Sequence, residues 1–252
     1  LKLLSRSVKK TGSKVSLQIY HVGAQGNPKH NGQEIIGPSS YFFPVIGTKV
    51  RALTVNEILK IEKQFIAALI SGYRTGFDFL ELHLAHGYLL HEFLSNFFNK
   101  RRDIYGGSFE NRLSIVLNII EGAYRICPEL KGKIGFRISA NDYLKNGFDL
   151  KLAKKLIYKL DVYKPAYYVI TAGQYETAKQ KYIDMKKGKY WEYAKTIKKV
   201  TNTPVIAQGS ITNLYVGDKL LREHYCDLYG MAQSLIADPQ LINKTIKKKE
   251  NK

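Results

Sequence analysis

Short apolar runs alternate along the chain with longer segments in which apolar residues recur at helical spacing. The apolar runs predict strands over residues 15–20, 77–83, 134–139, 167–171, 205–208 and 227–231. Strands that alternate with helix-length segments indicate a parallel sheet, because parallel neighbours need a crossover connection. The pattern therefore predicts an α/β fold.

One helix is marked at both ends. Thr54 and Glu57 form a capping box at its start, and Gly76 stands where a C-terminal cap would be. Apolar residues recur at helical spacing between these ends, at Ile58, Ile61, Phe65 and Leu69. Less strongly marked helices are expected over residues 150–160, 191–200 and 214–223.

Length and composition favour a single globular domain. With 252 residues, of which 44% are hydrophobic, the chain can build one large core and is too apolar for a disordered protein. No low-complexity linker divides it. We expect one domain over residues 1–244 and a basic tail over residues 245–252 that frays.

The formal net charge of +19 leaves two interpretations open. It could reflect a polyanionic partner, which would make this a basic nucleic-acid-binding protein. The lysines are instead spread along the chain, mostly on expected solvent faces of helices. A lysine-rich solvated surface is therefore the favoured interpretation, with neither a nucleic acid nor a membrane as partner.

The spacing of the cysteines and the lack of long apolar runs indicate where in the cell the protein is expected. Cys127 and Cys226 are far apart and show no paired spacing, so neither a disulfide framework nor a cysteine-based zinc site is indicated. Nothing resembles a signal peptide, and no apolar run approaches the roughly 20 residues that cross a bilayer. We expect a soluble cytoplasmic protein.

Candidate chemistry gathers after the second predicted strand. Alternation puts Phe79, Glu81 and His83 on one face of that strand, and His86 follows shortly after its end. In an α/β barrel this end of the strand faces the active site. The spacing H-x-x-H could also be half of a metal site, but no carboxylate stands at a suitable spacing and His91 has no evident reason to converge. A purely structural role in the core is a further alternative.

The segment "GFDFLELHLAHGYLLHEFLSNFFNKRRDIYGGSFENR" resembles the signature region of the old yellow enzyme family, the flavin-dependent ene-reductases and NADH:flavin oxidoreductases. Further similar stretches follow in the family's order: "SLQIYHVG" before it, then "GFRIS", "PVIAQGSI" and "DLYGMAQSLIADPQLINK". The last stretch is most similar to the 2,4-dienoyl-CoA reductase branch. The resemblance implies a TIM-type (β/α)8 barrel with non-covalent FMN and with NADH or NADPH as reductant.

The resemblance also implies catalytic roles for three residues. His83 and His86 would donate hydrogen bonds to the carbonyl oxygen of an α,β-unsaturated small molecule and so stabilise negative charge that develops on that oxygen. Tyr88 would deliver a proton to the α-carbon while reduced flavin gives hydride to the β-carbon, since a phenol stays protonated at neutral pH. The implied activity is reduction of an activated alkene, or of oxygen as an NADH oxidase.

Six positions correspond to FMN contacts of the family. Gln18 would bind the pyrimidine edge of the flavin, and Arg137 would lie against its ring and stabilise the anionic reduced form. The phosphate would be bound by the loops after the last two strands, at Gly209, Ser210, Ala232 and Gln233. The family usually has Gly-Arg where this chain has Ala-Gln, so the expected affinity for FMN is weak unless a lysine compensates.

The front of the barrel is expected to be incomplete, with about six of the eight βα units of the family present. In the family, two βα units precede the strand matched by "VSLQIYH". A six-stranded sheet would expose two parallel edges, which favours aggregation or a homo-oligomer. Two functional alternatives therefore stay open beside the enzyme: a non-catalytic remnant that keeps the motif without holding FMN, and the basic nucleic-acid-binding protein.

Overall fold

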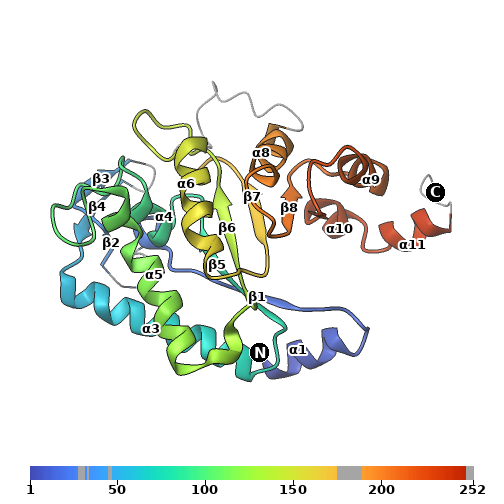
Figure 1. The fold of residues 1–252 in the computed structure, drawn as a ribbon, viewed down its shortest axis with the longest axis horizontal. Helices are drawn as coiled ribbons and strands as arrows, with labels where there is room; N and C mark the ends of the chain where they lie inside the picture. Colours follow the sequence, from blue (N-terminus) through green and yellow to red (C-terminus); the bar gives the residue numbers. More distant parts are fainter. Residues whose placement is uncertain (28–31, 33, 45–46, 175–188, 248–252) are drawn as a thin grey trace.

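The computed structural model describes residues 1–27, 32, 34–44, 47–174 and 189–247. Its centre is a parallel six-stranded sheet with the strand order β1-β5-β6-β7-β8-β9 (Figure 1). All six predicted strands are confirmed, with bounds at β1 (Ser16–Ile19), β5 (Phe79–Leu84), β6 (Ile134–Ser139), β7 (Tyr168–Thr171), β8 (Val205–Gln208) and β9 (Leu228–Gly230).

The best-marked helix, α3 (Val55–Arg74), has the predicted capping box: the Thr54 hydroxyl accepts from the Glu57 N–H, and the Glu57 carboxylate accepts from the Thr54 N–H. Gly76 follows in the left-handed region (φ 93°), where a side chain would be strained. The other helical elements are α1 (Lys2–Lys9), η1 (Gly23–Gln25), α4 (Leu89–Leu94), α5 (Phe109–Ile126), η2 (Pro128–Leu130), α6 (Leu150–Asp161), α8 (Lys189–Lys198), α9 (Leu214–Arg222), α10 (Gln233–Ala237) and α11 (Leu241–Ile246).

The C-terminal end differs in part from the expectation. Helix α11 runs to Ile246, so the first residues of the expected tail are helical, and residues 248–252 lie outside the described residues. Helix α11 lies beyond α9, farther from the sheet than α10 (Figure 1), and neither α10 nor α11 has a buried residue.

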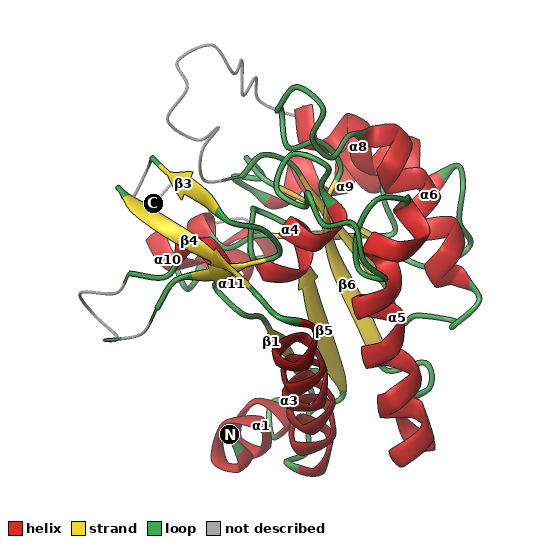
Figure 2. Ribbon diagram, turned by 90° about the vertical axis from the view of Figure 1, so that its left-hand side faces the viewer, coloured by secondary structure: helices red, strands yellow, loops and turns green. Residues whose placement is uncertain are grey.

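A second, small sheet was not predicted. It contains β2 (Ile36–Gly37), β3 (Tyr41–Phe43) and β4 (Thr48–Ala52) in the order β2-β4-β3, and lies beside α4 (Figure 2). The expectation of only six strands was wrong because these strands are short and are separated by proline and glycine, which hides their pattern. The Tyr41 hydroxyl donates to the buried carboxylate of Glu92 on α4 at 2.7 Å, which ties the small sheet to the main body.

Strand β5 lies inside the main sheet and is buried along nearly its whole length. Leu80, Leu82 and Leu84 are fully buried, as expected for a central strand of a parallel sheet with both faces covered. Its neighbours are β1 on one side and β6 on the other, and His83 pairs in register with Arg137. The carboxyl ends of these parallel strands therefore lie at one end of the sheet, where barrel enzymes build their sites.

The six strands do not close into a ring. Strands β1 and β9 form the two edges, and no strand within the described ranges pairs with their outer sides. Apolar side chains are exposed on the helices that flank the chain ends, including Leu3 of α1 (79% exposed) and Ile236 of α10 (81% exposed). The fold confirms the expectation of an incomplete α/β barrel. No helix in the described part of the chain is long and apolar enough to cross a membrane.

Candidate functional site

His83 and His86 meet at the carboxyl end of β5. The backbone of His86 is left-handed (φ 61°), a conformation that is uncommon for residues other than glycine. It is held by neighbouring strands and turns: the His86 N–H donates to the Ser139 hydroxyl at 3.1 Å, and its carbonyl accepts from the Gln25 amide. The ring centroids of the two histidines are 5.1 Å apart.

The two rings form a hydrogen-bonded chain. Nε2 of His83 lies 3.1 Å from Nδ1 of His86, and Nε2 of His86 lies 3.0 Å from the Thr171 hydroxyl. Nδ1 of His83 is buried and has no hydrogen-bond partner among the described residues. Burial lowers the pKa of His83 to about 2 and the pKa of His86 to about 3. Both rings are therefore neutral near pH 7 and can act as hydrogen-bond donors without carrying charge.

Tyr88 joins this pair, as expected. Its ring centroid is 5.0 Å from that of His83 and 5.0 Å from that of Tyr20, which comes from the end of β1. Tyr20 is 52% exposed, so the group opens toward solvent on that side. The structure thus brings the three predicted catalytic side chains together in one aromatic group.

His91 has a different surrounding. It lies on α4 with no exposed surface, and its Nδ1 accepts the Gly87 N–H at 2.9 Å. Burial lowers its pKa to about 3. This bond holds the turn between His86 and Tyr88. His91 therefore stabilises the backbone that positions these two residues. Within the described ranges, no three histidine, cysteine or acidic side chains are grouped so that they could hold a metal ion.

Gln18 lies on β1 beside β5. The family resemblance predicts that it binds the pyrimidine edge of the flavin. In the structure, its amide Nε2 donates to Oε1 of Glu81 at 2.6 Å. The two residues are register neighbours, and Glu81 lies on the same face of β5 as His83. This bond fixes the orientation of the Gln18 amide and leaves its carbonyl oxygen to accept from a ligand.

Arg137 extends from β6 and reaches across β7. Its Nη2 donates to Oε1 of Gln208 at 2.9 Å, while its Nε is buried without a partner among the described residues. Burial lowers the pKa of Arg137, but a guanidinium keeps its charge in proteins. A fixed cation with a buried, unpaired Nε–H therefore lies beside the histidine pair, and its charge contributes to the low pKa of both rings.

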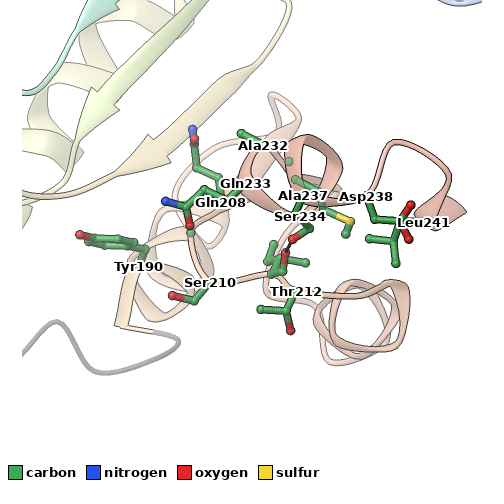
Figure 3. Close-up of a pocket in the computed structure, with 14 residues that line it drawn as sticks. Tyr190, Gln208, Ser210, Thr212, Ala232, Gln233, Ser234, Ala237, Asp238 and Leu241 are labelled. Atoms are coloured by element: carbon green, nitrogen blue, oxygen red, sulfur yellow. Dashed lines mark hydrogen bonds between the residues drawn. The ribbon is translucent and has the colours of Figure 1, made fainter. Parts of the chain in front are cut away.

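The four predicted phosphate contacts line one cavity of about 930 Å³, drawn in Figure 3. Gly209 and Ser210 follow β8, and Ala232 and Gln233 follow β9. Gly209 (φ 93°) lies so close to the Tyr190 ring that an added Cβ would collide with it.

Among the described residues that line the cavity there is no lysine or arginine. Lys244 approaches the rim, but its Nζ pairs with Asp238 at 2.9 Å. Backbone N–H groups and the side chains of Ser210 and Thr212 are candidate donors here for an anion. Compensation of the missing arginine by a lysine stays a prediction.

Two site residues were not predicted, Thr171 and Gln208. Each lies at the carboxyl end of its strand, β7 or β8, and each bonds a residue that was predicted. Their only sequence signal is a polar residue that ends a buried apolar run, as in "YYVIT" and "VIAQ". That signal indicates a site-facing side chain but cannot identify its partner.

Comparison with known proteins agrees with this geometry. The family model for NADH:flavin oxidoreductases / NADH oxidases matches residues 1–252. An NADH oxidase of Thermoanaerobacter brockii is 34% identical over 98% of this chain and 38% of its own length. An NADPH dehydrogenase of Clostridium acetobutylicum is 32% identical over 96% of this chain and 70% of its own length.

Solved structures show the same fold. The 2-naphthoyl-CoA reductase in complex with 2-naphthoyl-CoA superposes with a TM-score of 0.91 at 24% identity, over 99% of this chain and 40% of that one. The old yellow enzyme homologue from Zymomonas mobilis superposes with a TM-score of 0.79 at 20% identity, over 97% and 70%.

The chain thus spans between about two fifths and about two thirds of the length of these relatives. The match still extends from its first residue to its last. The resemblance seen in the sequence is confirmed. The chain belongs to the NADH:flavin oxidoreductase / NADH oxidase family.

Proposed function

We propose that this protein is an FMN-dependent oxidoreductase that takes hydride from NADH or NADPH and passes it to an activated alkene. The observation that carries the proposal is a pair of unused buried nitrogens at the carboxyl end of the sheet. Nδ1 of His83 and Nε of Arg137 are both buried, and neither has a hydrogen-bond partner among the described residues. Buried polar groups without partners are uncommon and indicate a ligand.

The residues present fit FMN. Arg137 offers a buried cation and a free N–H on β6, and Gln18 offers an amide whose orientation is fixed by Glu81. The cavity at Gly209, Ser210, Ala232 and Gln233 offers backbone donors for a phosphate. When bound, FMN would supply the two-electron transfer between the nicotinamide and the alkene.

His83, with its ring held by His86, would bind the carbonyl oxygen of the substrate. His86, which the resemblance makes a second donor, has both ring nitrogens in contact with protein groups in this structure. A donor held in a buried site stabilises negative charge on that oxygen more strongly than water does, because no reorganisation is needed when the charge develops. Neutral rings suit this role, since each can donate a hydrogen bond without carrying a charge. His83 supplies the donor that is not already used within the protein, and His86 holds its ring in place.

Tyr88 would supply the proton that the α-carbon gains. Its ring lies beside His83, so a carbonyl oxygen bound at Nδ1 would place the α-carbon within reach of the phenol. The reaction balances as hydride to the β-carbon and proton to the α-carbon. The phenol is then reprotonated from solvent, on the side where Tyr20 is exposed.

Anaerobic kinetics of the two half-reactions test this proposal. The chain loaded with FMN should be bleached by NADH or NADPH and should recover its colour with an unsaturated ketone such as cyclohexenone. Recovery with oxygen alone would point instead to an NADH oxidase, the activity named for one relative. Failure of both acceptors with a bleached flavin would contradict the proposed reaction.

A further inference from the structure

The hydroxyl of Thr171 has a single hydrogen-bond partner among the described residues. Thr171 ends β7 next to Ser139 of β6, and it is 5% exposed. Its hydroxyl lies 3.0 Å from Nε2 of His86 and makes no other hydrogen bond within the described part of the chain. A buried hydroxyl that touches a single ring nitrogen must either donate to that nitrogen or accept from it.

Each choice fixes the protons on both rings. A neutral imidazole carries one N–H and one lone pair, and the bond at one nitrogen determines the state of the other. If Thr171 donates, His86 carries its proton on Nδ1 and donates to Nε2 of His83, so that His83 must carry its proton on Nδ1. If Thr171 accepts, both protons move to Nε2, and Nδ1 of His83 presents a lone pair.

The hydrogen-bond count favours donation by Thr171. In the accepting arrangement, the Thr171 hydroxyl proton has no acceptor, because no other partner lies near it among the described residues. In the donating arrangement that proton is satisfied, and one N–H is left over, at Nδ1 of His83. Each arrangement leaves one buried donor unpaired, but the accepting arrangement also leaves the Nδ1 lone pair of His83 without a donor. Buried polar atoms without partners are costly, so the donating arrangement, which leaves fewer of them, is preferred.

We infer that Thr171 is a positioning residue that sets the direction of the chain Thr171–His86–His83 and so directs an N–H from Nδ1 of His83 toward the substrate oxygen. The use of that N–H rests on the proposed function, whereas the proton positions do not. The donor at the substrate is thereby controlled from β7, two strands away from β5.

The test is the tautomeric state of the histidine rings, measured by long-range ¹H–¹⁵N correlation in the folded chain near pH 7 without added flavin. The wild-type chain and Thr171→Ser, which keeps the hydroxyl, should show His83 and His86 protonated on Nδ1. Thr171→Val has nearly the same shape but no hydroxyl. In this variant, both rings should revert to Nε2–H, the form that free neutral histidine prefers.

Two results would overturn the inference: Nε2–H on His83 in the wild-type chain, or unchanged tautomers in Thr171→Val. A second readout is the affinity for phenol in the chain loaded with FMN, which should fall about tenfold in Thr171→Val and recover in Thr171→Ser. If the tautomers behave as stated and the chain never binds FMN, the proposed function fails while the role of Thr171 in setting the protons stands.

Discussion

Nη2 of Arg137 donates a 2.9 Å hydrogen bond to Oε1 of Gln208, and this bond links β6 to β8 across the intervening strand β7. Gln208 also lines the cavity that contains the expected phosphate contacts. The bond therefore connects the part of the site beside the histidines with the part beside Gly209. A ligand that contacts both parts must lie next to this bond.

Removal of Arg137 should weaken FMN binding. A hydrogen bond to a charged group contributes about 1.5–3 kcal/mol, so Arg137→Ala should lower the affinity roughly 10- to 150-fold. Isothermal titration with FMN measures this. Arg222→Ala removes the same charge from the exposed end of α9 and serves as the control. Equal loss in both variants would mean that net charge, rather than the site, governs binding.

Restoring a cation at Gln233 should strengthen FMN binding. The described part of the cavity lining has no lysine or arginine, and the family usually has arginine at this position, so Gln233→Arg should raise the affinity about tenfold or more. Gln233→Leu is the uncharged control. Riboflavin lacks the phosphate, so its affinity should not change, and an equal gain for riboflavin would contradict a phosphate site in this cavity.

Tyr88→Phe should separate the two half-reactions. The ring remains beside His83 and Tyr20 while the proton donor is lost, so flavin reduction by NADPH should stay near the wild-type rate. Alkene reduction should slow by about 10²–10⁴-fold, the usual contribution of a general acid. Stopped-flow spectroscopy follows each step. Equal slowing of both steps would remove Tyr88 from the role of proton donor.

The buried histidines should make stability fall with acid. In the folded chain the pKa values of His83, His86 and His91 are about 2, 3 and 3, below the unfolded value of about 6.5. Above pH 6.5 neither state is protonated and the full stability is present. As the pH falls from about 6.5 toward 3, the unfolded chain binds protons that the folded chain does not, and the free energy of unfolding decreases.

The size of this effect can be tested with His91→Gln, whose side chain can still accept the Gly87 N–H. Each such histidine contributes a slope of up to about 1.4 kcal/mol per pH unit, so this variant should lose about that much of the slope between pH 5 and 6. Urea denaturation at several pH values measures it. The exposed His224→Asn is the control, and an unchanged slope in His91→Gln would mean that His91 is protonated in the folded chain.

Expressed alone, residues 1–252 should self-associate. No strand in the described part of the chain pairs with the outer side of β1 or of β9, and the apolar side chains of Leu3 and Ile236 are 79% and 81% exposed. The double variant Leu3→Glu, Ile236→Lys should therefore lower the associated fraction in analytical ultracentrifugation. Added polypeptide that supplies two βα units should do the same and sharpen the unfolding transition. A wild-type monomer with a sharp thermal transition would show that these edges are stable as they are.

Much of the main sheet could be predicted because parallel strands are short continuous apolar runs, as in "FLELHL" and "IGFRIS". The small sheet could not, since Tyr41–Phe43 and Ile36–Gly37 are too short for a period to show. The grouping of His83, His86 and Tyr88 could be predicted because these residues are close together in sequence. Thr171 and Gln208 could not be predicted as hydrogen-bond partners, because their contacts depend on which strands are neighbours in space. A hydrogen bond across β7 has no counterpart in the spacing of residues along the sequence.

The most direct test of the flavoprotein assignment is an absorbance titration of the folded chain with FMN, followed by anaerobic addition of NADPH. We predict a saturable shift of the flavin spectrum that Arg137→Ala weakens, and bleaching of the bound flavin by NADPH. A chain that leaves the spectrum of free FMN unchanged at high protein concentration would contradict the assignment and would identify the protein as a family member that has lost its cofactor.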